Sequence, residues 1–175
     1  MANQVPEKMI NYRVYGNNGA DYLGVVDAEL PSIEAMTETI SGAGIAGEVD
    51  SPTLGHFGSI KLTLKWRTVN KKFIEFAAQQ AHDLDLRSAN QVYDAGSGTY
   101  SEEAVRITCR AVPRNLALGS LVVGKSADSS TEFEVLQMRV YIDGNEVLEL
   151  DKYNFIYRVN GVDYLKGVRG SLGLN

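Results

Sequence analysis

The chain has 175 residues and a mass of 19.1 kDa, with 44% apolar and 22% charged residues, which is the composition of a folded protein with an ordinary core. Its net charge of -5 argues against general binding to nucleic acid or to anionic membranes. The single cysteine excludes an internal disulfide and a multi-cysteine zinc site, two histidines exclude a histidine-rich metal site, and no stretch approaches the roughly 20 apolar residues of a membrane anchor.

The first sixty residues predict a hairpin followed by a long loop. Residues 9–15 alternate loosely, the Gly-Asn-Asn-Gly sequence at 16–19 supplies a tight turn, and residues 22–30 return as a second strand. No period is sustained over residues 31–59, and five glycines and Pro52 interrupt the second half of this segment. We therefore expect a long Gly-rich loop at about 31–59, of the kind that compact proteins keep for a function.

The middle of the chain predicts three strands and one helix. Residues 60–67 alternate strictly between apolar and polar side chains, which is the clearest half-buried strand in the sequence. Apolar residues then recur at helical spacing, so we expect one amphipathic helix at about 71–82, with His82 as a cap at its carbonyl end. Residues 86–93 and 104–111 read as further strands.

The last third predicts a hairpin and a short ending. Residues 131–142 alternate over a long run, turn at Asp143-Gly144-Asn145, and return over 146–151. Residues 153–159 suit a last strand, and 163–172 suit either a short helix or a tail, since glycines weaken the helix.

These elements predict a fold that is mainly β. About seven strands and one helix are expected, without the regular alternation of strand and helix that makes a parallel sheet. The prediction is a single domain over 1–175, an antiparallel β-sandwich or barrel with one flanking α-helix and a long Gly-rich loop.

Two glycine patterns match nucleotide-binding motifs in letters alone. Gly42–Gly47 fits G-x-G-x-x-G, but a glycine- and proline-bearing segment follows it where a dinucleotide site needs a helix. Gly119–Ser126 fits G-x-x-x-x-G-K-[ST], but it runs into an alternating strand rather than a helix whose N-terminus would face phosphates. We read both as loops, and nucleotide binding as the weak alternative.

Other chemistry is sparse. Glu132 and Glu134 lie on one face of a strand, where a pair for glycoside hydrolysis is conceivable and a solvated face is the simpler interpretation. Cys109 lies in an apolar alternating run and is expected to be a small buried hydrophobe. We therefore expect no enzyme activity and assign no catalytic, cofactor-binding or metal-binding residue.

Several segments resemble a known family. They are Leu30-Pro31-Ser32, Ile40–Gly47, Val140–Asp151 and the ending Leu172-Gly173-Leu174, together with the closing motif Asn160, Gly161, Val162, Asp163 and Leu165. In this order the chain resembles the major tail tube proteins of contractile-tailed bacteriophages, and the related inner tubes of R-type bacteriocins are similar. The resemblance covers roughly residues 20–66 and 131–174.

The resemblance implies a structural virion protein. Such subunits form hexameric rings that stack into a hollow tube inside a contractile sheath, assembled in the bacterial host cytoplasm, for DNA ejection. The implied partners are other copies of the chain and the tail sheath, tape-measure, baseplate and tail terminator proteins, while DNA passes without specific binding. The alternatives are the tube of a headless R-type bacteriocin or of another contractile injection system, including a type VI-like one.

We hypothesise two assembly surfaces. The hairpin at 131–151 would contribute to a sheet around the lumen, where acidic residues would repel DNA phosphates. The candidate lumen face is Glu132, Glu134, Glu146 and Glu149. Residues 1–60 carry a net charge of -6 and residues 61–80 a net of +4, so opposite patches could meet on neighbouring copies.

The second surface is a ring-stacking loop with basic partners on the adjacent copy. The candidate loop residues are Ser41, Gly42, Gly44, Gly47, Glu48, Asp50 and His56. The candidate partners are Lys61, Lys65, Lys71 and Lys72. Glycines permit the close approach that such a contact needs.

Overall fold

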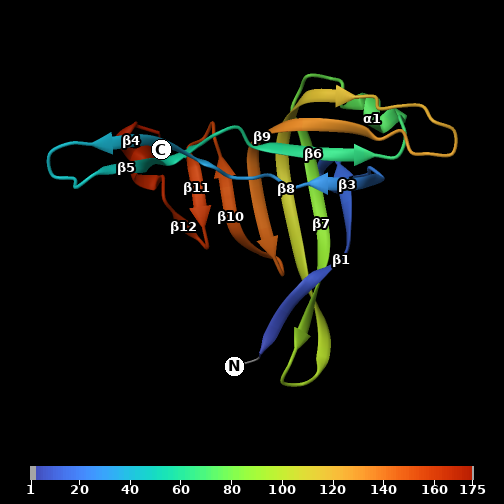
Figure 1. The fold of residues 1–175 in the computed structure, drawn as a ribbon, viewed down its shortest axis with the longest axis horizontal. Helices are drawn as coiled ribbons and strands as arrows, with labels where there is room; N and C mark the ends of the chain where they lie inside the picture. The colour runs from blue at the N-terminus through green and yellow to red at the C-terminus, as the bar shows by residue number, and fades with distance from the viewer. Residues whose placement is uncertain (1–2, 175) are drawn as a thin grey trace.

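The computed structural model describes residues 3–174, and its regular structure is dominated by antiparallel β-sheet (Figure 1). Strands take up 59% of the chain and helices 8%. The main sheet consists of β1 (Gln4–Gly16), β2 (Asp21–Tyr22), β3 (Val25–Glu29), β6 (Lys61–Trp66), β7 (His82–Asp94), β8 (Thr99–Ala117), β9 (Ser129–Ile142), β10 (Asn145–Asp151), β11 (Ile156–Val159) and β12 (Val162–Asp163). The mainly β, antiparallel fold class predicted from the sequence is confirmed.

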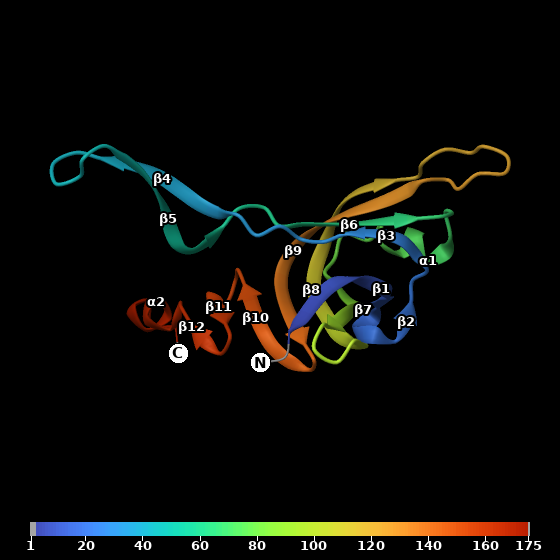
Figure 2. The same cartoon turned by 60° about the horizontal axis from the view of Figure 1, so that its bottom comes forward.

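The main sheet branches at β9. One edge of β9 pairs with β8 along its length, and the other edge pairs first with β6 and then with β10. At the change of partner Leu136 is the extra residue of a bulge, opposite Arg110 and Ala111 of β8. Because a bulge bends and twists its strand, β6 and β3 fold over β1 and β7 as a second layer, while β10, β11 and β12 continue the first (Figure 2).

The core fills the space between the two layers. Strand β6 points Leu62, Leu64 and Trp66 inward, as its alternation predicts, and all three are buried. Phe73 of α1 packs edge-on against Trp66, and Phe76 packs against Phe133 of β9. These aromatic contacts close one end of the barrel-like body.

Two hairpin turns agree with the sequence. Asp143 and Gly144 join β9 to β10, and Asn160 and Gly161 join β11 to β12, with positive φ at all four residues. Asp-Gly and Asn-Gly suit two-residue hairpin turns because both tolerate this left-handed geometry. The hairpin predicted around residues 143–145 is therefore confirmed.

The predicted N-terminal hairpin is largely wrong. Strand β1 meets the returning chain only at two positions, after the short 3-10 helix η1 (Asn17–Gly19). Gly24, with φ of +67°, then redirects the chain so that β3 pairs with β6 in the other layer. The main partner of β1 is β7, nearly seventy residues further along the chain.

The helix predicted at 71–82 is also too long. Helix α1 covers Lys71–Glu75, with Asn70 as its N-cap, and turns follow it. His82 is not a helix cap but the first residue of β7, although its Nε2 lies 3.1 Å from the carbonyl oxygen of Ala78. The apolar residues after Glu75 therefore do not extend the helix, and from His82 onward the chain pairs with β8.

The C-terminal segment forms a short helix, α2 (Lys166–Ser171), which settles the choice between helix and tail left open by the sequence. Within residues 3–174, no helix is long and apolar enough to cross a membrane.

Candidate assembly surfaces

The segment predicted to be an irregular loop is a projecting hairpin. Strands β4 (Ala35–Ser41) and β5 (Glu48–Phe57) pair as a separate two-stranded sheet, which we call the arm. The arm extends from one end of the molecule, and α1 lies at the other end (Figure 1). The sequence did not predict these strands because nearly every arm residue is exposed. Since neither face of the arm is buried, apolar and polar residues do not alternate along it.

The arm surface combines acidic and apolar side chains. Large apolar side chains are exposed along it, including Met36, Ile40, Val49 and Leu54. Glu48 and Asp50, two of the predicted stacking residues, lie on β5, and Thr39 donates a hydrogen bond to Asp50 across the pair. Ser41 ends β4, and Gly42, Gly44 and Gly47 form the tip with positive φ. An isolated two-stranded hairpin is only marginally stable in water, so an apolar arm of this kind needs a partner surface.

The base of the arm rests on the closing motif of the chain. Gly55 of β5 has φ of +68°, and a Cβ there would lie 2.4 Å from Leu165, which is itself buried. Asp163 accepts hydrogen bonds from the Leu165 amide and from Arg169 of α2, and these bonds lower the pKa of Asp163. The motif therefore holds Leu165 against the arm, with His56 facing the same depression.

The four candidate basic partners differ in their surroundings. Lys65 pairs with Glu29 at 2.6 Å, and Lys72 lies 3.7 Å from Asp21 and donates to the carbonyl of Tyr22. Within residues 3–174, Lys61 and Lys71 make no ion pair. Only the latter two keep their charge free for another molecule, and Lys71 begins the helix at the end opposite the arm.

The predicted lumen residues of β9 lie on the face opposite the core. Glu134 accepts hydrogen bonds from Ser59, from the Ile60 amide and from Lys152. Burial opposes ionisation, but these hydrogen bonds and the Lys152 charge lower the pKa of Glu134. Glu132 lies 3.8 Å from Arg114. Both carboxylates therefore form contacts between neighbouring segments at the point where the sheet branches.

The predicted lumen residues of β10 are also paired. Glu149 is 3% exposed and binds Arg139 at 2.7 Å and Arg158 at 2.6 Å, and Glu146 lies within 4.0 Å of the same two arginines. The structure therefore brings the four glutamates to one face, but basic groups compensate them. That these glutamates line the lumen stays a prediction. The uncompensated negative charge expected of them is absent, because basic groups pair with them.

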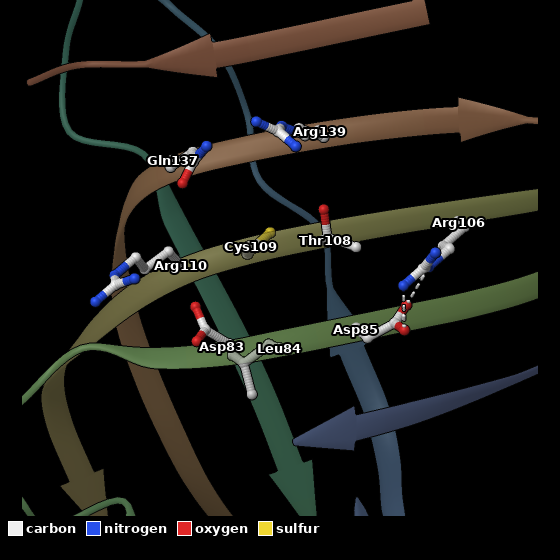
Figure 3. Close-up of a pocket in the computed structure, with 9 residues that line it drawn as sticks. All are labelled: Asp83, Leu84, Asp85, Arg106, Thr108, Cys109, Arg110, Gln137 and Arg139. Carbon is white, nitrogen blue, oxygen red and sulfur yellow. Dashed lines mark hydrogen bonds and ion pairs between the residues drawn. The ribbon is translucent and has the colours of Figure 1, made fainter. Parts of the chain in front are cut away.

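A further carboxylate on this face was missed by the sequence analysis. Asp85 of β7 is 1% exposed and lies beside a shallow depression, where Arg106 of β8 binds it (Figure 3). Arg87 binds the same carboxylate at 2.7 Å. Burial opposes ionisation, but the two arginines lower the pKa of Asp85. The alternation of side chains along the strand could have placed Asp85 on this face. It could not have predicted how deeply Asp85 is buried or which arginines bind it.

Cys109 lies on the core side of β8, as predicted, and is 3% exposed. Burial raises the pKa of its thiol to about 12, so the group stays protonated at neutral pH. Of the two glycine patterns, Gly42–Gly47 joins β4 to β5 and Gly119–Ser126 joins β8 to β9, so each lies between strands.

The sequence model of one family, described as phage tail tube protein FII, matches residues 6–173. This range contains the arm, the branched sheet and the closing motif. The chain belongs to the phage tail tube protein FII family. It is a structural tail tube subunit and a component of the virion tail, so the family recognised from the sequence is confirmed.

Two further proteins are similar to this chain, one in sequence and one in fold. The tail tube protein of Escherichia phage P2 is 26% identical over 167 residues, which cover 90% of this chain and 92% of that protein. A solved chain of the sheath/tube terminator of the extracellular contractile injection system PVC, in its extended state, has the same fold with a TM-score of 0.56 and 14% identity. The match covers 80% of this chain and 99% of that one.

Proposed function

We propose that this tail tube protein forms hexameric rings, which stack into the hollow inner tube of a contractile tail and conduct DNA during ejection. The whole chain acts as one tail tube domain, without catalytic activity or cofactor. Its other partners are the sheath, tape-measure, baseplate and tail terminator proteins, and assembly takes place in the host cytoplasm.

The arm is the observation that carries the stacking proposal. It is exposed on both faces, acidic and apolar, and it lies at the opposite end of the molecule from α1. A contact between two different ends of identical molecules is heterologous, and where it does not close into a ring it repeats without limit, which is what the length of a tube requires. Lys71, which has no ion pair within residues 3–174 and begins α1 at the end opposite the arm, is the best-placed basic partner for Glu48 and Asp50, and Lys61 is the second unpaired candidate.

Ring closure would use the edges of the main sheet. Beyond its pairing with β7, β1 is covered near its end, by β2 at Tyr15 and Gly16 and by the Leu23 amide at Val14, and the short β12 ends the other side. Backbone groups on an open strand edge are free to pair with another chain. The face that bears Glu132, Glu134, Glu146 and Glu149 would then line the lumen, with the 131–151 hairpin in the interior of each subunit's sheet.

Negative-stain electron microscopy of the purified protein tests this function. Hollow rods built of stacked rings are expected. A variant lacking residues 43–52, which form the arm tip and the start of β5, should stay soluble and form no rods. A wild-type protein that stays monomeric at every concentration would refute the proposal, and rods of normal length from the variant would refute the role of the arm.

A further inference from the structure

Two buried carboxylates lie beneath four arginines on the face of the sheet opposite the core. Asp85 and Glu149 have side chains that are only 2% and 4% exposed. The arginines above them, Arg87, Arg106, Arg139 and Arg158, are between 38% and 51% exposed. Directly above these two carboxylates the exposed groups are therefore mainly guanidinium groups, and much of the negative charge that balances them is buried below.

Strand register brings the two carboxylates into one row. Asp85 lies opposite Thr108 of β8, which lies opposite Arg139 of β9. Arg139 lies opposite Glu149 of β10, and Glu149 opposite Arg158 of β11. The row thus crosses five strands.

Each carboxylate binds two arginines, and three of the four arginines bind through two nitrogens, whereas Arg158 binds Glu149 through Nη1. Arg106 donates from Nε and Nη2 to the two oxygens of Asp85, at 3.0 and 2.9 Å, and Arg87 donates from the same two nitrogens to Oδ2. Arg139 donates to Oε1 of Glu149 and Arg158 to Oε2. A guanidinium group binds a phosphate through the same fork geometry, so a carboxylate already seated there competes with phosphate directly.

We propose that Asp85 and Glu149 are built-in substitutes for phosphate, which keep the arginines of this face from binding the DNA backbone. This mechanism differs from simple repulsion, because the buried carboxylates occupy arginine donors and do not present negative charge to the DNA. The face then remains polar and hydrated but offers DNA few unoccupied cationic donors. The consequence for ejection rests on the proposed function, because it requires that this face borders the path of the DNA.

Binding of a fluorescently labelled double-stranded DNA to the purified subunit, measured by anisotropy, tests the proposal. Wild-type protein should bind negligibly at 50 mM salt. Asp85→Asn should bind measurably, because it releases two arginines that face the solvent. Glu149→Gln should gain less binding, because Glu146 stays within 4.0 Å of both Arg139 and Arg158. Two released phosphate contacts should make the gain salt-dependent, with about a tenfold loss between 50 and 200 mM salt.

Glu102→Gln is the matched control. Glu102 lies two alternating positions from Arg106 on β8, so it shares the face, and it is exposed without an ion pair among residues 3–174. All three variants change the net charge by the same amount. If Glu102→Gln raised DNA binding as much as Asp85→Asn, general repulsion would explain the effect and the proposal would be wrong.

A triple variant and the wild type keep the test decisive if a single variant folds poorly. Adding Arg106→Gln and Arg87→Gln to Asp85→Asn should abolish the gained binding, and both circular dichroism and thermal melting check the fold. Folded variants that gain no affinity would overturn the proposal. Wild-type binding that is lost on Arg106→Gln would overturn it as well, because that arginine would then be free for phosphate.

Electron microscopy of the same samples separates this proposal from the proposed function. Variants that gain DNA binding while the wild type forms no rods would support the phosphate-substitute role and contradict tube formation. Rods from the wild type together with no gain in any folded variant would contradict only the phosphate-substitute role.

Discussion

The molecule contains two long hairpins with opposite surroundings. The β9–β10 hairpin lies inside the main sheet and buries Phe133, Val135 and Leu150, whereas the arm is a separate pair of strands with apolar side chains in solvent. Both are antiparallel and both are joined by turns with positive φ. Strand pairing alone therefore does not explain the arm, since a hairpin without a packed face has little stability of its own.

The two hairpins differ in the source of their stability. The β9–β10 hairpin is stabilised by its own chain, through burial of apolar area. The arm has exposed apolar residues but no core of its own, so its stability is expected to come from a second copy. Under the proposed function, folding depends on the body and assembly depends on the arm.

The largest expected effect on stability comes from shortening a buried side chain of the β9–β10 hairpin. Phe133→Ala removes a fully buried ring that packs against Phe76, and it should lower the free energy of unfolding by about 3–5 kcal/mol. Ile40→Ala, on the arm, should change it by less than about 0.5 kcal/mol. Urea unfolding measures both, and a large loss from Ile40→Ala would show that the arm is part of the monomer's core.

An intermediate effect is expected at the base of the arm. Gly55→Ala puts a side chain at positive φ and against Leu165, and should cost about 1–3 kcal/mol. Gly58→Ala is the control, because a Cβ there meets nothing closer than 3.9 Å, at the Glu34 carbonyl oxygen. We expect Gly55→Ala to impair rod formation as well, since the arm would leave the body at another angle. Equal behaviour of the two variants would argue against the Leu165 contact.

The smallest effect should appear on acidification. The pKa values of Asp85, Glu134 and Asp163 are lowered in the folded protein, so their contribution to stability is present above the ordinary carboxyl pKa of about 4 and is lost as pH falls through the lower folded values. Melting temperature should therefore decline below about pH 4. Asp85→Asn should weaken this decline, and an unchanged decline would mean that Asp85 does not contribute.

The sequence predicted those features that depend on residues close together in the chain. The turn at Asp143-Gly144 follows from residues that tolerate positive φ, and the inward side chains of β6 follow from strict alternation. The fold class followed from these strands. The family resemblance rested on other segments as well, including residues 40–47 of the arm, and it is confirmed.

Other features depended on contacts that the sequence does not display. The arm has no period because neither of its faces is buried, and so it was predicted to be a loop. The apolar spacing after residue 71 suggested three turns of helix, but Leu84 belongs to a ladder with β8. The partners of Asp85 and Glu149 come from other strands, so only the fold reveals that these carboxylates occupy arginine donors.

Hydrogen exchange of the wild-type protein, compared between the monomer and the assembled rods, tests the central claim most directly. We expect the amides of β4 and β5 to exchange fast in the monomer and to become strongly protected in rods, while those of β9 are protected in both states. Arm amides that exchange equally fast in monomer and rods would contradict the claim that a second copy of this chain covers the arm.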